Sequence, residues 1–168
     1  MKIVPVFFKY DYGDPKRGES YEQLNFYRVL KNIFKEVKPF WIEENGYLND
    51  KGLLQKNLID FAEKEKPDII FFALIKDEFT HETLTYLKNN FTTLNLFIDD
   101  QWRFDAFTKE YAHLFSNVAT FDKYSLAKYH EIGVRSVILT KVFSFDHFDE
   151  LDFKKIEYNY DISFIGSR

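Results

Sequence analysis

Residues 94–104 read Leu94-Asn95-Leu96-Phe97-Ile98-Asp99-Asp100-Gln101-Trp102-Arg103-Phe104, and this stretch decides the fold. Its apolar residues predict a buried strand that ends at two adjacent acids, Asp99 and Asp100. An indole, a guanidinium and a helical pattern follow at once. In open α/β sheets, ligands bind just outside the carboxyl ends of the strands. The stretch therefore predicts a ligand crevice, provided that the rest of the chain builds such a sheet.

Strand and helix patterns alternate strictly on both sides of this stretch. The helices between the strands carry start and stop signals, such as a capping box of Ser20 with Gln23, a cap at Asn49 or Asp50, and an end at Gly133. Strict alternation predicts a Rossmann-like α/β fold, a doubly wound and mostly parallel sheet with helices on both faces. The predicted strands cover 3–9, 39–43, 69–74, 93–98, 118–121 and 134–139.

The composition is that of a globular domain with an unusual share of rings. Hydrophobic residues make up 45% of the 168 residues, which fits one domain with its own core. Aromatic residues make up 20%, and we expect most of them to fill the core, although some can serve as stacking platforms for a sugar or a base. The net charge of -4, without a long Lys/Arg block, argues against a nucleic-acid partner.

Cysteine usage and the first residues bear on the compartment. The chain has no cysteine, which excludes disulfides, thiolate metal sites and a cysteine nucleophile and fits a reducing compartment. The apolar run at residues 3–8 is too short for a signal peptide or a transmembrane helix. We therefore predict a cytoplasmic protein without a transmembrane segment.

The last part of the chain breaks the alternation. Residues 143–159 are acidic and aromatic and read as a linker, and residues 160–168 begin a new strand that ends in Gly166-Ser167-Arg168. A strand followed by a glycine turn is typical of the start of a second α/β domain, where phosphate approaches a helix N-terminus. The predicted organisation is a Rossmann-like domain over 1–142, a linker, and the first strand of a truncated C-terminal domain.

Four segments, in this order, resemble the CgeB-like (spore-maturation type) glycosyltransferases. They are residues 97–104, residues 120–122 (Thr-Phe-Asp), residues 128–134 (Lys-Tyr-His-Glu-Ile-Gly-Val) and residues 160–166 (Tyr-Asp-Ile-Ser-Phe-Ile-Gly). The resemblance implies the GT-B class, in which two Rossmann-like domains face each other across a cleft. It implies that this chain is the acceptor-side domain of an enzyme that transfers a sugar from a nucleotide-sugar donor to a sugar or glycan acceptor. The missing domain would hold most donor contacts, so we expect no bound cofactor and no activity from this half alone.

Glycosyl transfer needs a carboxylate that deprotonates or orients an acceptor hydroxyl. Asp99 and Asp100 are the candidates, and only one should face the cleft because adjacent strand residues point to opposite sides. We predict Asp100 as the catalytic group in an exposed groove, with Asp99 as a substrate contact. The alternative is that one of the pair caps the helix that begins near Trp102. A metal site is not expected, because the spaced Asp-x-Asp pattern is absent.

The remaining candidate contacts follow three predicted strands. Trp102 can stack on a sugar face, but packing under the helix is the more frequent role of such a residue. Arg103 can bind a phosphate or an acidic acceptor, or pair with Asp99 or Asp105. The loop after the first strand offers Tyr12 and Gly13, with a flexible surface loop as the alternative. The third strand ends at Lys76 and Asp77, with His81 one helical turn further on as an acceptor contact or a solvated residue.

Two other classes of function compete with the transferase. A non-catalytic α/β binding or regulatory domain is the main alternative, although a receiver domain would need acids after the first strand, where this chain has Lys9 and Tyr10. A small standalone α/β enzyme is disfavoured because neither a phosphate loop nor a nucleophile motif is present. Dimerisation through the aromatic surface is left open by the sequence.

Overall fold

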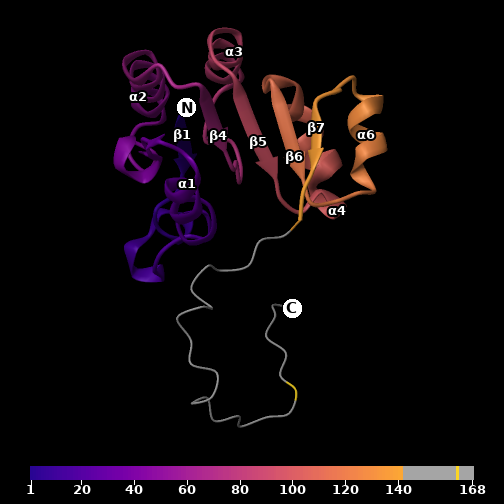
Figure 1. Cartoon of the computed structure of the whole chain (residues 1–168), viewed down its shortest axis with the longest axis horizontal. Coiled ribbons are helices and arrows are strands. Elements are labelled where there is room, and N and C mark those ends of the chain that lie inside the picture. The colour runs from indigo at the N-terminus through magenta and orange to yellow at the C-terminus, as the bar shows by residue number, and fades with distance from the viewer. Residues whose placement is uncertain (142–161, 163–168) are drawn as a thin grey trace.

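A single parallel sheet organises the computed structural model, which describes residues 1–141 and residue 162 (Figure 1). The seven-stranded sheet has the order β2-β1-β4-β5-β6-β7, and β3 also pairs with β1. All pairs are parallel, which confirms the predicted Rossmann-like α/β fold. Apart from Ile162, the predicted linker and the predicted strand at 160–168 lie outside the described residues. The strands are β1 (Lys2–Phe7), β2 (Glu36–Val37), β3 (Phe40–Trp41), β4 (Ile69–Phe72), β5 (Thr93–Phe97), β6 (Asn117–Thr120) and β7 (Val137–Leu139).

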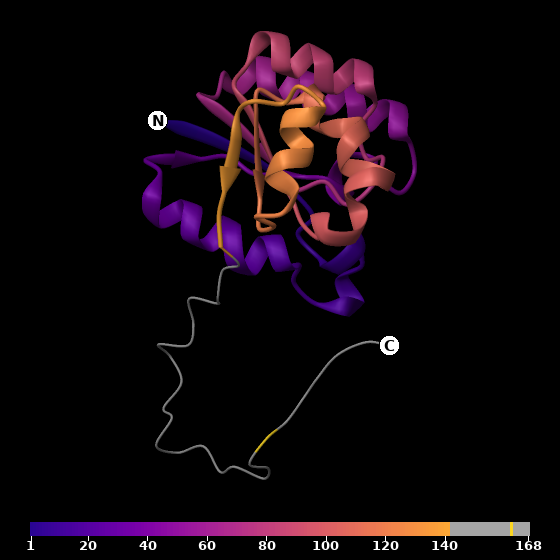
Figure 2. The ribbon, with the colours of Figure 1, turned by 90° about the vertical axis from the view of Figure 1, so that its right-hand side faces the viewer.

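Helices cover both faces of the sheet, as Figure 2 shows for α1 (Arg28–Ile33) on one side and α2 (Lys51–Glu65) with α3 (His81–Asn90) on the other. A π-helical turn, Gln23–Tyr27, leads into α1, and its Phe26 packs with Leu30 against Ile3 and Phe7. The face under α2 and α3 also receives α6 (Ser125–Glu131) through Tyr129. Both sides of the sheet are therefore apolar, as the continuous run Ile69–Phe72 predicts.

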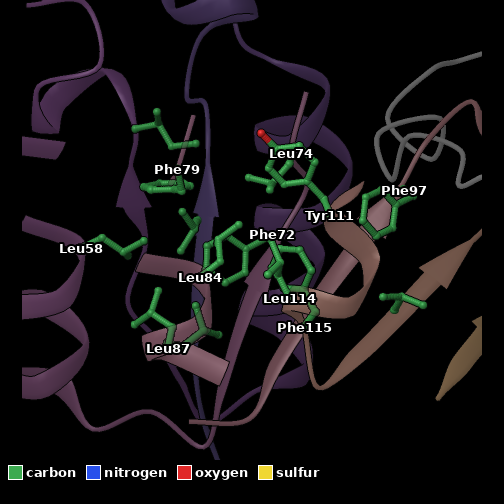
Figure 3. Close-up of a cluster of buried hydrophobic side chains, with 14 of the residues drawn as sticks. Leu58, Phe72, Leu74, Phe79, Leu84, Leu87, Phe97, Tyr111, Leu114 and Phe115 are labelled. Carbon is green, nitrogen blue, oxygen red and sulfur yellow. The ribbon is translucent and has the colours of Figure 1, made fainter. Parts of the chain in front are cut away.

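The larger core lies between the sheet and α2, α3 and α6 (Figure 3). Phe72 of β4 is fully buried, and its ring centroid lies 5.9 Å from that of Phe79 and 5.4 Å from that of Phe115. Phe97 of β5 lies against the same Phe115 ring. Several rings of the Phe-rich composition thus fill the core, as expected, and tilted or edge-on pairs of this kind stabilise it beyond simple area burial.

The helix starts predicted at Ser20 and at Asp50 are confirmed, and Thr80 caps α3 in the same way. Asp50 accepts a hydrogen bond from the Leu53 amide (3.0 Å), and Thr80 accepts one from the Thr83 amide (3.2 Å). Ser20 accepts one from the Gln23 amide (2.9 Å), which fixes the first turn after the long loop that follows β1. Each cap satisfies a backbone donor that a helix end leaves without a partner.

Two elements differ from the prediction for local reasons. The predicted second strand over 39–43 is limited to β3, and a further short strand, β2, lies before Pro39, which has no N–H to donate to the ladder. The helix expected after β5 is broken into α4 (Asp100–Arg103), a π-helical turn at Phe104–Thr108 and α5 (Lys109–Tyr111). Among the described residues, no helix is long and apolar enough to cross a membrane.

Candidate functional site

The strand order creates a switch point between β1 and β4. The chain leaves β1 toward β2 and β3 on one side and then returns to β4 on the other side, so the loops after β1 and β4 run apart. Crevices at such points are the usual ligand sites of open α/β sheets. A cavity of about 790 Å³ lies there, at the carboxyl ends of the strands. It is lined by Asp11, Tyr12, Tyr21, Glu22, Ala73, Leu74, Ile75, Lys76, Ile98, Asp99, Gln101, Trp102, Arg103 and Phe121.

The structure brings five of the predicted site residues together in this cavity. They are Tyr12, Lys76, Asp99, Trp102 and Arg103. They come from the loops after β1 and β4 and from the segment after β5, where Trp102 and Arg103 belong to α4. The loop after the first strand therefore forms part of a site wall, although it carries no phosphate-binding pattern.

Asp100 is the main correction. Its side chain is only 1% exposed and does not line the cavity, so the expected placing of Asp100 in an exposed groove is wrong. Its carboxylate accepts hydrogen bonds from the hydroxyls of Thr108, Thr120 and Tyr129, each at 2.6 Å. Asp100 could reach a ligand in the cavity only by breaking these bonds. It therefore ties α4 to β6 and α6, and Asp99 is the acid that faces the cavity.

The turn between β5 and α4 explains why Asp99 faces the cavity and Asp100 does not. Asp99 adopts the left-handed conformation (φ 67°, ψ 30°), which directs the next residue under the helix, and its side chain caps no amide. The described residues hold three non-glycine residues with positive φ, namely Tyr12, Lys66 and Asp99. Lys66 ends α2, whereas Tyr12 and Asp99 both line the cavity. Left-handed backbone costs about 1–2 kcal/mol at such residues and tends to cluster at functional sites.

Trp102 and Arg103 form the wall of the cavity next to Asp99. Trp102 is 71% exposed, so the alternative in which it packs under the helix is wrong. The Arg103 guanidinium donates a hydrogen bond to the carbonyl of Ile75 and lies 4.4 Å from the centre of the Phe107 ring. Within the described part of the chain Arg103 forms no ion pair, and Asp105 instead pairs with Lys128. Arg103 thus joins α4 to the loop that follows β4.

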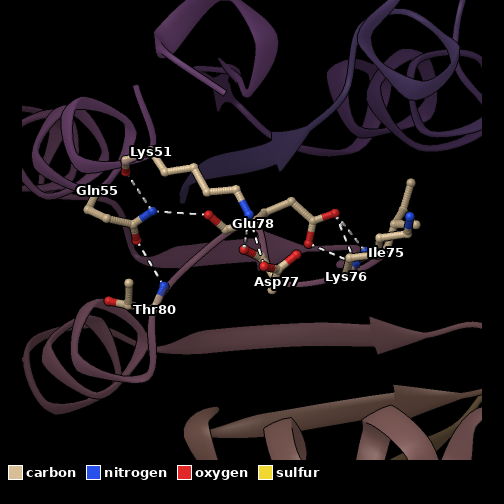
Figure 4. Close-up of polar contacts among 7 residues, drawn as sticks. All are labelled: Lys51, Gln55, Ile75, Lys76, Asp77, Glu78 and Thr80. Atoms are coloured by element: carbon tan, nitrogen blue, oxygen red, sulfur yellow. Dashed lines mark hydrogen bonds and ion pairs between the residues drawn. The ribbon is translucent and has the colours of Figure 1, made fainter. Parts of the chain in front are cut away.

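A buried carboxylate shapes the loop after β4 (Figure 4). Glu78 is 1% exposed and accepts hydrogen bonds from the amides of Ile75 (3.3 Å) and Lys76 (2.9 Å). Gln55 of α2 holds the same loop from outside, because its side chain donates to the Glu78 carbonyl and accepts from the Thr80 amide, each at 3.0 Å. Burial raises the pKa of Glu78, and these hydrogen bonds oppose that rise. The loop therefore presents Ile75 and Lys76 to the cavity in a fixed conformation.

Three other predicted contacts do not line the cavity. Asp77 forms an exposed ion pair with Lys51 at 2.9 Å, which lowers the pKa of Asp77. The Nε2 atom of His81 lies 3.2 Å from a carboxylate oxygen of Glu110 on α5. Gly13 is buried at φ 76°, where a Cβ atom would lie 3.3 Å from the Cβ of Glu43. Its role is to let the loop after β1 pack closely, since an L side chain would be strained there.

Sequence reasoning missed Tyr21 and Glu22 in the first helical turn after the β1 loop. Glu22 is 6% exposed and lines the cavity, and burial raises the pKa of its carboxyl group. The Tyr21 hydroxyl is buried and has no hydrogen-bond partner among the described residues. The cap at Ser20 places this turn at the carboxyl edge of the sheet, and that signal could have pointed to both residues. Periodicity alone marks them as ordinary polar positions.

The raised pKa of Glu22 predicts a pH-dependent stability difference between wild type and Glu22→Gln. A carboxyl group with a folded pKa above its unfolded value stabilises the fold below the unfolded pKa, and this contribution is lost as pH rises through the folded pKa. Between the unfolded and the folded pKa, the free energy of unfolding of the wild type should fall by up to about 1.4 kcal/mol per pH unit relative to that of Glu22→Gln. Urea unfolding from pH 4 to 8 measures the difference. Glu131→Gln is the control, because Glu131 is exposed. If the stability of wild type and of Glu22→Gln varied with pH in parallel, the prediction would be contradicted.

The described residues contain no group of three or more His, Cys, Asp or Glu side chains that could hold a metal ion. The site is a cavity of mixed charge with exposed rings and carboxylates at the switch point of a parallel sheet.

Comparison with family models, with curated proteins and with solved structures finds no match to this chain.

Proposed function

We propose that this chain is the acceptor-side domain of a GT-B-like sugar transferase and that its cavity holds a sugar of the acceptor. One observation carries the proposal: the switch-point cavity combines the exposed rings of Tyr12 and Trp102 with the carboxylate of Asp99. Aromatic faces stack on the C–H faces of a pyranose, and carboxylates accept hydrogen bonds from its hydroxyls. The four segments that resemble CgeB-like transferases support the same conclusion.

The proposed division of labour follows from the cavity. Asp99 orients an acceptor hydroxyl and is the candidate base for its proton, because it is the acid after β5 that lines the cavity. Tyr12 and Trp102 hold the sugar ring, and Lys76 and Arg103 lie at the same wall. The nucleotide-sugar donor is a co-substrate held mainly by a second domain, so residues 1–168 alone bind an acceptor sugar without transferring to it.

Titration of the chain with neutral sugars, followed by NMR chemical shifts, tests the binding step. We expect Trp102→Ala and Asp99→Asn each to weaken the binding of a methyl hexopyranoside about tenfold, which corresponds to about 1.4 kcal/mol and is typical of one stacked ring or one hydrogen bond to a charged group. Tyr124→Ala and Asp60→Asn are matched controls, since these exposed residues lie outside the cavity. Equal affinities for the site variants and the wild type would refute the proposed site.

The main alternative is a non-catalytic α/β binding domain. Such a domain would have the same cavity but would use no nucleotide-sugar donor. A transfer assay therefore distinguishes the two proposals. When the chain is joined to a donor-binding domain, the transferase proposal expects a labelled sugar to move from a nucleotide sugar to the bound acceptor. Acceptor binding without any transfer in the joined protein would favour the binding domain.

A further inference from the structure

Two buried polar groups of the cavity, the Tyr21 hydroxyl and the Glu22 carboxyl, have hydrogen-bonding capacity to spare. The Tyr21 hydroxyl is shielded from solvent and has no partner among the described residues. Glu22 is 6% exposed, and hydrogen bonds with its own backbone amide and with the Ser20 side chain oppose the rise in its pKa that burial causes. No Lys, Arg or His of the described residues forms an ion pair with Glu22. Burying a carboxyl group without a cation, or a hydroxyl without a partner, destabilises a fold, so such groups are retained where a ligand completes them.

Tyr21 and Glu22 belong to one turn and lie at the same cavity. Both residues line it, and the charge of Glu22 contributes to the raised pKa of Tyr21, after burial as the larger cause. The Ser20 cap fixes the turn at the end of the β1 loop. The ring of Tyr21 lies edge-on to Phe26 at 5.5 Å, which holds the hydroxyl in place. The two groups are therefore preorganised with unfilled hydrogen-bonding capacity.

The charges around Glu22 determine which ligand would fit. The charges that act on Glu22 are those of Glu78 of the β4 loop and of Asp11 of the β1 loop, and Asp11 is itself paired with Arg17 at 2.6 Å. The other charged groups of the cavity are Asp99, Lys76 and Arg103. Because Arg17 already pairs with Asp11, the negative charge that an anionic group would meet on this wall is that of Glu22, whereas neutral hydroxyl groups could donate to Glu22.

We infer that Tyr21 and Glu22 form a specificity pair that binds hydroxyl groups of a neutral sugar and excludes carboxylated or phosphorylated sugars from this wall. The inference rests on the proposed function and names its substrate class. Glu22 accepts a hydrogen bond from one sugar hydroxyl. The Tyr21 hydroxyl donates to a neighbouring sugar oxygen. The Tyr21 hydroxyl gains the partner that the unliganded chain does not supply, and the Glu22 carboxylate uses acceptor positions that its hydrogen bonds within the chain leave open.

The test is a comparison of three probes with the complete chain: a methyl hexopyranoside, the matching hexuronic acid and the matching hexose 6-phosphate. Dissociation constants come from NMR titration. We expect wild type to bind the neutral sugar at least tenfold more tightly than either anion. Glu22→Gln should weaken neutral-sugar binding about tenfold and narrow the preference over the anions, since the repelling charge is gone. Tyr21→Phe should weaken neutral-sugar binding severalfold without changing that preference.

Matched control substitutions outside the cavity distinguish an effect on sugar recognition from an effect on folding. Glu131→Gln and Tyr124→Phe are exposed, lie outside the cavity and should behave as wild type. Urea unfolding checks that each variant is folded. Affinities of Glu22→Gln and Tyr21→Phe within twofold of wild type would overturn the inference and leave the proposed function standing if Trp102→Ala still weakens binding. Tighter binding of an anionic probe would also overturn the inference, and no binding of any probe would overturn both proposals.

Discussion

Replacing Asp100 with alanine should lower the free energy of unfolding by about 3–5 kcal/mol, the usual range for breaking a buried charged network. Three hydroxyls, those of Thr108, Thr120 and Tyr129, would lose their acceptor in the interior. Burial and the neighbouring Asp100 carboxylate raise the pKa of Tyr129, so its hydroxyl remains a donor that needs an acceptor. This loss in the free energy of unfolding should be several times larger than the loss caused by a substitution at an exposed residue.

Urea denaturation of Asp100→Ala and of Asp105→Ala measures this difference. Asp105 lies five residues further on, is largely exposed and is 3.6 Å from Lys128, so its removal should change stability by less than about 1 kcal/mol. Asp100→Asn should lie between wild type and Asp100→Ala, because its amide oxygen can still accept. A loss below about 1 kcal/mol for Asp100→Ala would show that the hydroxyls find other acceptors.

Replacing Glu78 with alanine should cost about 2–4 kcal/mol, because it leaves the amides of Ile75 and Lys76 without their acceptor. The rise in the pKa of Glu78 shows that burial works against its carboxylate, which is why we expect a smaller effect than at Asp100. The loop after β4 should also open more often. Hydrogen exchange at these two amides should therefore accelerate even where the fold is intact.

The adjacent residue is the control for Glu78. Asp77 is a carboxylate of the same loop, but its ion pair with Lys51 is exposed, so Asp77→Ala should change stability by about 1 kcal/mol or less. Thermal or urea unfolding of the two variants side by side gives the comparison. Equal losses would mean that the buried hydrogen bonds of Glu78 contribute little more than a surface pair.

The fold was predictable because its signals are local. Hydrophobic runs mark the strands, and caps such as Ser20 and Asp50 mark the helix starts. The order of the elements along the chain and the parallel pairing of the strands then follow from alternation. The separation of β2 from β3 was also readable in principle, since Pro39 removes an amide from the ladder. The π-helical turn that interrupts the helix after β5 could not be predicted. The apolar spacing of Phe104, Phe107 and Tyr111 fits a regular α-helix as well as a helix that contains such a turn.

The site was predictable in place but not in detail. The end of β5 did lead to the cavity, and Asp99, Trp102 and Arg103 line it. Which of two adjacent acids faces the ligand depends on Thr120 and Tyr129, which are 20 and 29 residues away in the chain. Trp102 is exposed and Glu22 is buried, the reverse of what their residue types suggest. Such reversals depend on tertiary contacts that no local pattern encodes.

The position of β1, between β2 with β3 on one side and β4 on the other, has a consequence for how the molecule forms. β1 is synthesised before the other strands of this sheet, and its short partners β2 and β3 follow first. Its register partners in β4, such as Ile70 for Val4, follow more than sixty residues later. At ordinary rates of synthesis this amounts to several seconds during which the β4 side of an apolar strand has no partner. The cavity closes later still, when Phe121 arrives beyond β6. Assembly of this domain is therefore paced by the arrival of β4, and chaperone dependence should be greatest before β4 is made.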